Sequence, residues 1–310
     1  MKTAIYTPIR NELRIVEFIN YYLKLGFDYF ILFDDNSDIP ITKILKDNNF
    51  NMNMFSVIQN IYYKDIKGIY SCKHWAELIC PVLHKENIDY LLHVDADEFL
   101  YSRHFNNIKQ IIENYSPFDR LHVNWVCFGG LLKKNESLSL INTFTRSEDF
   151  LQLNGKSLVK LSSLDVTDIS SYICPHFLKM KSNSIQKDIQ NNNFSLEKLN
   201  IKTIDAPMYI AHYSHQDIEG YIDRKTSSDL HLEVYYSHIV DKNNRQRIIN
   251  KIKKYRNEII NSVYYKNCDF IKNIDEKEDV PFNILVNAFV NTYEHLIDMY
   301  KIDNNDLKIS

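Results

Sequence analysis

Three carboxylates stand close together in the stretch LLHVDADEFLY, residues 91–101. Asp95, Asp97 and Glu98 follow an apolar run, and the chain returns at once to apolar residues. Carboxylates this close repel one another unless a cation lies among them, and burying an unpaired charge is costly. Strand alternation places Asp95 and Asp97 on one side and Glu98 on the other. Two carboxylates at a strand end suit Mg²⁺ or Mn²⁺, although a solvated turn is the simpler alternative.

A cation at this position would suit a diphosphate substrate. Such ions usually take only one or two protein carboxylates, because water and substrate phosphates fill the other positions. A metal that bridges a diphosphate makes it a better leaving group, since it neutralises the charge that grows as the bond breaks. Ala96, between the aspartates, is small enough for a ribose or sugar to approach the backbone.

A second acidic cluster, FDDNSD, ends another apolar run at residues 33–38. Its residue types suit a turn or a helix N-cap. Asp35 would equally suit a hydrogen bond from the N–H group of a nucleotide base, and the residue types alone leave both roles open.

The surrounding pattern places both acidic clusters at the ends of strands. Residues 2–9 and 28–37 read as strands, and residues 12–27 between them carry apolar side chains at helical spacing. A helical stretch over 71–88 then leads into the strand that ends at Asp95. This rhythm predicts βαβ units and a mostly parallel sheet. Ligands of such sheets bind at the carboxyl ends of the strands.

Beyond residue 115 the strand-like runs are shorter, and polar loops separate them. From residue 216 onward the pattern is largely helical. We therefore expect an α/β domain of Rossmann-like type over residues 1–215 and a helical extension packed on it over residues 216–310. The later strand-like runs cover residues 120–130, 156–166, 171–180 and 207–215.

The composition restricts the classes of partner. The 310 residues are 45% hydrophobic and 25% charged, as in an ordinary globular protein. A net charge of -3 gives no reason to expect nucleic acid as a partner. The basic run at 241–256 would suit contact with an anionic membrane, although a solvated helix face explains it more simply. No glycine-rich phosphate motif is present, so a nucleotide would be held by other means.

The cysteines and the N-terminal sequence favour a cytoplasmic protein. Five widely spaced cysteines include no C-x-x-C pair, which favours reduced, structural thiols. The opening MKTAIYTPIRNE reaches charged residues too early for a signal peptide. No run approaches the ~18 apolar residues of a membrane span.

Several motifs follow one another along residues 3–226. They are TPIRNELRIVEFINYYLKLGFDYFILFDDNSD, HVDADEFL, VNWVCFGG, GKSLVK, the PHF at 175–177 and IAHYSHQDIEGYIDRK. In this order they resemble the N-E pair and first helix, the D-x-D-E-F signature, the W-x-x-F-G element and the later lysine, histidine and H-Y…K elements of one group of enzymes. That group is the GT-A glycosyltransferases related to family 2 and, more closely, to family 92. Each motif alone is weak, and the order carries the resemblance.

The resemblance implies a GT-A fold and transfer of a sugar from a nucleotide-sugar donor, UDP-galactose or another UDP-sugar, to a glycan or glycolipid acceptor. On this basis Thr7, Arg10 and Asn11 lie in the first loop over the nucleotide, and Asp35 binds the uracil ring. Lys73 faces the nucleotide or is a solvated helix lysine.

The resemblance also implies the metal and its ligands. Mn²⁺ is the usual ion, with Mg²⁺ as the alternative, and Asp95, Asp97 and His212 form the expected ligand set. His176 is the second choice for the histidine. Asp95 and Ala96 are also expected to line the nucleotide.

An inverting transferase needs a carboxylate base within hydrogen-bond reach of the acceptor hydroxyl. Glu98 and Asp149 are the candidate catalytic carboxylates, although Glu98 is more readily explained as a brace for the loop. Glu148, beside Asp149 in TRSEDF, and Asp217 are further candidates, and a solvated loop charge is the simpler explanation of each.

Two other functions remain as alternatives. Phosphatases of the aspartyl-phosphate type also end a strand in D-x-D, but on the first strand of the chain. A non-catalytic protein with this fold would bind a glycan or a partner protein. Trp75, Trp125 and the many tyrosines would suit stacking on sugars, and core packing is their commoner use. Stabilisation by UDP that depends on Mn²⁺ would separate the transferase from the non-catalytic protein.

Overall fold

A computed structural model describes residues 1–12, 14–60, 78–129, 139–145, 147–164, 172–174, 177–195 and 200–215. Apart from residues 129, 144, 145, 214 and 215, the described residues belong to one compact unit. Within the described residues, no helix is long and apolar enough to cross a membrane. The predicted helical extension over 216–310 lies outside the described residues and stays a prediction.

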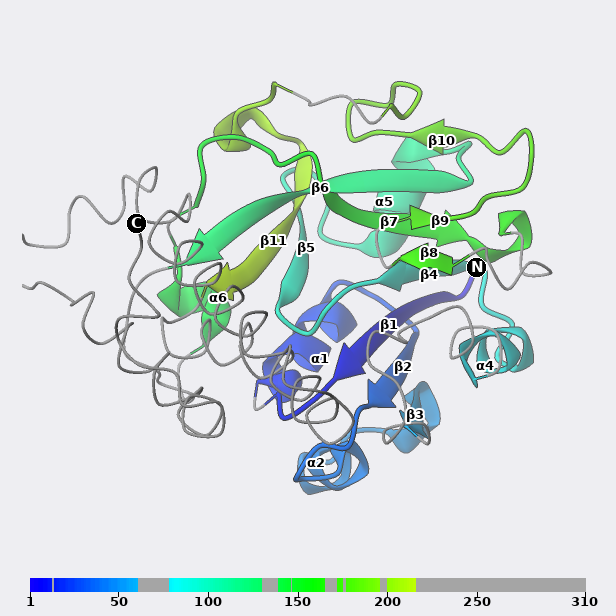
Figure 1. The fold of residues 1–310 in the computed structure, drawn as a ribbon, viewed down its shortest axis with the longest axis vertical. Helices are drawn as coiled ribbons and strands as arrows, with labels where there is room; N and C mark the ends of the chain where they lie inside the picture. The colour runs from blue at the N-terminus through cyan, green and yellow to red at the C-terminus, as the bar shows by residue number, and fades with distance from the viewer. Residues whose placement is uncertain are drawn as a thin grey trace, which may run out of the picture. The chain divides into compact units, whose positions relative to one another are not determined.

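The unit is built on one large sheet, whose strand order is β3-β2-β1-β4-β7-β6-β11-β5, with β10 paired to β6 (Figure 1). A separate pair is formed by β8 and β9. The strands are β1 Thr3–Ile9, β2 Tyr29–Asp34, β3 Phe55–Gln59, β4 Tyr90–His93, β5 Glu98–Ser102, β6 Arg120–Gly129, β7 Gly155–Lys160, β8 Tyr172–Cys174, β9 Phe177–Leu178, β10 Gln186–Lys187 and β11 Met208–His215. The helices of four or more residues are α1 Ile15–Lys24, α2 Ile41–Asp47, α4 Cys80–Lys85, α5 Ile108–Tyr115 and α6 Leu140–Thr143.

The βαβ interpretation of the N-terminal part is confirmed. β1 pairs in parallel with β2 on one side and with β4 on the other, and β2 pairs in parallel with β3. α1 connects β1 to β2, and its buried residues recur at helical spacing, at Ile15, Phe18, Ile19 and Tyr22. The carboxyl ends of β1, β2 and β4 therefore meet at one edge of the sheet.

Beyond β4 the sheet is mixed, which corrects the expectation of a mostly parallel sheet. β7 runs antiparallel to both β4 and β6, and β11 runs antiparallel to β5. The change of direction brings the start of β7, at Gly155, to the same edge as the end of β4. The Rossmann-like α/β fold class with flanking helices is confirmed for the described residues.

Both faces of the parallel part are buried. Ala4, Tyr6 and Phe33 pack in one cluster with Leu83 of α4. The alternate residues point to the other face and are fully buried as well, Ile5, Phe30, Leu32 and Leu92 among them. Apolar runs without polar alternation are typical of strands covered on both sides.

The sequence analysis did not predict the short helices α2 and α5, although both carry apolar residues at helical spacing. In α5, Ile108, Ile111, Ile112 and Tyr115 are buried at helical spacing, and the Asn107 side chain caps the first turn. α2 likewise buries Ile41 and Leu45, which are four residues apart and lie on one face of the helix. Short amphipathic helices give few periods to recognise, so local pattern alone favours them weakly.

Candidate active site

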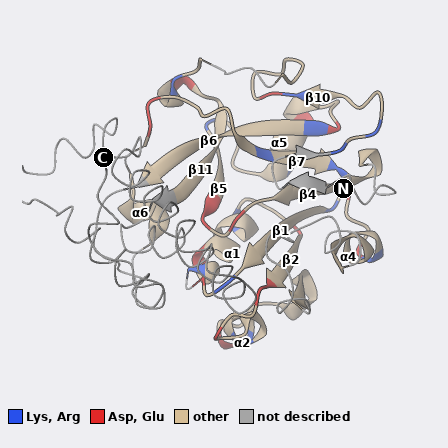
Figure 2. Ribbon diagram, in the orientation of Figure 1, with Lys and Arg blue, Asp and Glu red and all other residues tan. Residues whose placement is uncertain are grey.

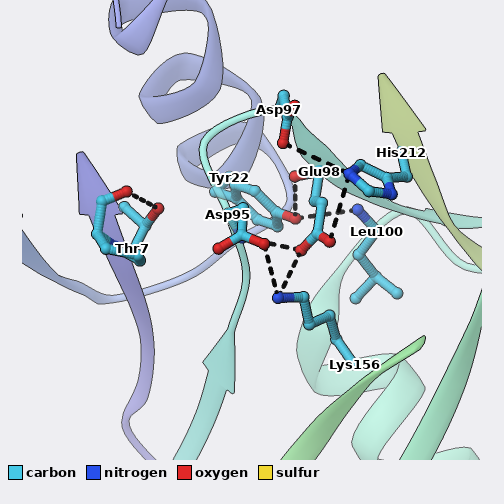
Figure 3. Close-up of polar contacts among 9 residues, drawn as sticks. Thr7, Tyr22, Asp95, Asp97, Glu98, Leu100, Lys156 and His212 are labelled. Carbon is cyan, nitrogen blue, oxygen red and sulfur yellow. Dashed lines mark hydrogen bonds and ion pairs between the residues drawn. The ribbon is translucent and has the colours of Figure 1, made fainter. Parts of the chain in front are cut away.

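The acidic cluster, residues 95–98, forms a turn between two strands, and we call it the acidic turn. β4 ends at His93 and β5 begins at Glu98. The Glu98 N–H donates to the Asp95 carbonyl at 3.0 Å, and the Asp95 N–H donates to Glu98 Oε2 at 2.8 Å. Asp95 and Glu98 therefore lie together, and Asp97 lies apart, toward His212 (Figure 3). The expectation that Asp95 and Asp97 share one side was wrong, because strand alternation does not apply across a turn.

A lysine to which the sequence analysis assigned no role in the site joins this turn from the neighbouring strand. Leu92 near the end of β4 pairs with Leu158 of β7, which places Lys156, two residues earlier on β7, next to the turn that follows β4. The Lys156 side chain is fully buried, and its Nζ lies 2.9 Å from Asp95 Oδ2 and 3.3 Å from Glu98 Oε2. A buried ammonium group needs such partners. The available signal was the GKSLVK segment, whose lysines flank the apolar pair Leu158 and Val159.

The three charges shift one another's pKa values. Burial raises the pKa of Asp95, but the Lys156 ammonium outweighs this and lowers it to about 2. Burial lowers the pKa of Lys156, and the two carboxylates reverse this, so that the lysine stays charged. Burial, with added repulsion from Asp95 and Asp97, raises the pKa of Glu98 well above its usual range despite Lys156. Figure 2 shows acidic residues where β4 passes into β5.

The Asp95–Lys156 ion pair predicts a dependence of stability on pH. The pKa of Asp95 is about 2 in the folded chain, below its ordinary value of 3.8. Its contribution to stability is therefore present above pH 4 and is lost as the pH falls toward 2. We expect Asp95→Asn to lower the free energy of unfolding at pH 6, and the difference from wild type to shrink between pH 4 and pH 2. Urea titrations at several pH values measure this, and a constant difference would contradict it.

Asp97 and His212 meet across the β5–β11 pair. Glu98 pairs with His212 in the antiparallel register, and the Tyr213 N–H donates to the Asp97 carbonyl at 2.9 Å. His212 Nε2 lies 3.8 Å from Asp97 Oδ1 and 4.0 Å from Glu98 Oε1. The His212 ring packs against Trp125 of β6 with ring centroids 4.6 Å apart. The strands β5, β6 and β11 thus hold the His212 imidazole close to the Asp97 and Glu98 carboxylates.

The donor atoms suit a divalent cation. Within the part of the chain that the structure describes, no three histidine, cysteine, aspartate or glutamate side chains form a complete metal centre. Mg²⁺ and related ions need only one or two protein ligands when substrate phosphates complete the shell, and Asp97 and His212 are the two expected here. Glu98 Oε1 is buried beside them and accepts no hydrogen bond from the protein. A buried carboxylate oxygen without a donor fits a cation nearby.

Tyr22 of α1 supports the first residues of β5. Its fully buried hydroxyl donates to the Glu98 carbonyl at 2.9 Å and accepts from the Leu100 N–H at 3.0 Å. Burial raises its pKa, which keeps the hydroxyl protonated. The helix and the acidic turn are therefore joined by one side chain.

We expect Tyr22→Phe to lower the free energy of unfolding by about 1–3 kcal/mol, because it leaves two buried backbone groups without partners. The matched control is Tyr29→Phe. In the wild type, the Tyr29 hydroxyl bonds to the partly buried Ser56 hydroxyl at 2.9 Å. The control should cost less, since water can replace that bond. Equal losses for the two variants in urea titration would contradict the assigned support.

Of the predicted nucleotide-binding residues of the first loop, Thr7 lies within β1 and not in a loop, whereas Arg10 and Asn11 follow β1, and Asp35 follows β2. Thr7 is buried on β1, and its hydroxyl donates to the Pro8 carbonyl at 3.4 Å. The exposed Arg10 guanidinium lies 4.0 Å from the Asp35 carboxylate. Asp35 also accepts from the Asn60 amide, which sequence reasoning did not single out.

Asn11 holds the two loops together. Its N–H donates to the Ser37 hydroxyl, and its side chain exchanges two hydrogen bonds with Asp38. Its backbone φ of 51° is in the left-handed region, where asparagine is enriched. Ala96 is buried within the acidic turn. The structure brings Arg10, Asn11 and Asp35 together at the carboxyl edge of the sheet.

The other predicted carboxylates lie on a different segment. Asp149 is exposed, and its carbonyl accepts from the Thr203 N–H at 2.8 Å. Glu148 accepts from the Gln152 side chain at 2.8 Å. In the described ranges, no contact joins either carboxylate to the acidic turn. Lys73, His176, Asp217 and Trp75 lie outside the described residues.

Comparison with known proteins gives distant likenesses. No family model matches this chain, and no curated protein sequence matches it significantly. Among solved structures, the mannosyltransferase Ktr4p from S. cerevisiae is 13% identical with a TM-score of 0.27, over 40% of this chain and 39% of Ktr4p. The chain thus spans about two fifths of that protein.

Two further solved structures have similar scores. HddC from Yersinia pseudotuberculosis is 11% identical with a TM-score of 0.36, over 61% of this chain and 89% of HddC. Core-mannan synthase A from Aspergillus fumigatus, in a form with Mn and GDP, is 13% identical with a TM-score of 0.25, over 40% of this chain and 42% of that protein.

Proposed function

We propose that this chain is a GT-A type glycosyltransferase that moves a sugar from a UDP-sugar to a glycan or glycolipid acceptor. Galactose is our first choice of sugar. The observation that carries the proposal is the meeting of Asp97 and His212, 3.8 Å apart, beside the acidic turn at the carboxyl end of β4. The order of sequence motifs supports the same function.

The arrangement of the strands supports binding of a nucleotide across β1. Asp35 follows β2 and Asp95 follows β4, and both strands flank β1. Two strand spacings separate these carboxylates by about 10 Å, with the end of β1 and Thr7 between them. A nucleoside diphosphate laid across β1 would present its base to Asp35 and its diphosphate to the acidic turn.

Each residue of the turn then has a distinct role. Asp97 and His212 would hold a Mn²⁺ or Mg²⁺ ion, which when bound neutralises charge on the departing diphosphate. Asp95 has one oxygen on Lys156 and a side chain that is 41% exposed, so it can also accept from a ribose hydroxyl. Glu98 is fully buried, which favours bracing of the turn over direct contact with an acceptor.

For the base of an inverting reaction we favour Asp149. Its carboxylate is exposed, as a group that takes a proton from an acceptor hydroxyl must be. Glu148 is engaged by Gln152 and is the less suitable of the pair. Asp149→Asn should then lower transfer to acceptor while leaving donor binding unchanged.

A donor hydrolysis screen tests the proposal. The chain is incubated with each of several UDP- and GDP-sugars and Mn²⁺, and released nucleotide is detected. We expect release from one or a few UDP-sugars and loss of release on chelation of the metal. If no donor is turned over and UDP with Mn²⁺ gives no thermal stabilisation, the non-catalytic alternative replaces this proposal.

A further inference from the structure

We propose that Lys156 is a positioning residue for this sugar transfer, whose buried ammonium group holds the acidic turn in the conformation that receives the donor. The inference rests on the proposed function. It assigns a role to a residue on β7 that lies 61 positions along the chain from Asp95.

Lys156 cannot act on the donor directly. Its side chain has no exposed surface, and its Nζ is occupied by Asp95 Oδ2 at 2.9 Å and Glu98 Oε2 at 3.3 Å. Both ion pairs end on the acidic turn (Figure 3). Any effect of Lys156 on the donor must therefore pass through those two carboxylates.

The two carboxylates differ in a way that separates positioning from simple charge balance. Glu98 is fully buried, so its ionised form needs a cation, whereas the Asp95 side chain is 41% exposed and could be solvated alone. The shorter contact nevertheless goes to the exposed carboxylate. One ammonium thus ties the solvent-facing side of the turn, where the donor would bind, to the buried side.

The lysine itself is held from a third side. Its Nζ lies 5.8 Å from the centroid of the Trp125 ring, and the same ring packs against His212. Lys156 also pairs with Val123 of β6 through the backbone. The ammonium group therefore has a fixed place between the Asp95 side and the His212 side of the site.

Two variants separate positioning from stability. Lys156→Met alone leaves Glu98 buried without a cation and is expected to fold poorly. The double variant Lys156→Met/Glu98→Gln removes both buried charges at similar volume, and the glutamine oxygen can still accept from the Asp95 N–H. Glu98→Gln alone is the reference, because Lys156 then still contacts Asp95.

The affinity for UDP at saturating Mn²⁺, measured by titration calorimetry, and the melting temperature are compared between the reference and the double variant. We expect similar melting temperatures and at least a tenfold weaker affinity in the double variant. Equal affinities would overturn the inference and show a merely structural lysine.

If the double variant does not fold, Lys156→Arg decides the question. It keeps the positive charge but changes its shape and position, and a folded variant with wild-type affinity would overturn the inference. Weakened affinity at an unchanged melting temperature would support it. A wild-type chain that binds no UDP with Mn²⁺ refutes the proposed function, and this inference with it. Wild-type binding without a loss in the variants refutes the inference alone.

Discussion

Asp97→Ala is expected to lower sugar transfer by about 100- to 1000-fold, the loss typical when one preorganised charge-stabilising group is removed. The melting temperature should stay the same or rise slightly. The Asp97 side chain adds to the repulsion that raises the pKa of buried Glu98, so its removal relieves an unfavourable charge. The backbone carbonyl of Asp97, which accepts from Tyr213, is unchanged. Nucleotide release and a thermal melt on the same preparation measure both effects.

The matched control is Asp47→Ala on α2, which removes an exposed carboxylate whose partner is Lys43, one turn earlier in the helix. Surface pairs of this kind contribute little, so activity and stability should both stay near wild type. Turnover by Asp97→Ala at the wild-type rate would refute the assigned metal role. A large fall in its melting temperature would show that Asp97 supports the fold instead.

Gly155→Ala is expected to destabilise the chain by about 3 kcal/mol or more, at the upper end of overpacking effects. A Cβ at this position would lie 2.1 Å from the Val123 carbonyl oxygen and 2.8 Å from the Asn124 Cα. Both are backbone atoms of the paired strand β6, so no side-chain rotation relieves the clash. The strands must separate, and Lys156 moves with Gly155. Urea titration measures the loss, and donor hydrolysis should fall with it.

Ser157→Ala is the control on the same strand, because it removes an oxygen without adding volume. The Ser157 hydroxyl lies 3.4 Å from His122 Nδ1, a weak contact, so we expect a cost of about 1 kcal/mol at most. A Gly155→Ala variant as stable as Ser157→Ala would mean that β6 and β7 are not held this close.

The strands that carry the site could be predicted because their signals are local. The apolar runs before Asp35 and Asp95 give β2 and β4, and the helical spacing between β1 and β2 gives α1. A βαβ unit places such strand ends at one edge. The resemblance placed both Arg10 and Asp35 at the nucleotide, and they lie 4.0 Å apart.

The acidic turn could not be read correctly from local pattern. The apolar run before Asp95 suggested that all three carboxylates lie at the end of one strand. In the structure, β4 ends before Asp95 and a second strand, β5, begins at Glu98. β5 forms through pairing with β11, whose residue His212 lies far along the chain. Lys156 is also distant from Asp95 in sequence, and the residues around it do not indicate which carboxylates it contacts. Long-range pairing therefore decides which way each carboxylate points.

Binding of a nucleotide diphosphate to the acidic turn and His212 through a divalent cation can be tested by the melting temperature of the wild-type chain with UDP, with Mn²⁺ and with both together. We expect a clear rise only with both, since a ligand at 100 times its Kd adds about 2.7 kcal/mol to stability. Asp97→Ala should show no such rise. No rise in the wild type, or an equal rise in Asp97→Ala, would contradict such binding.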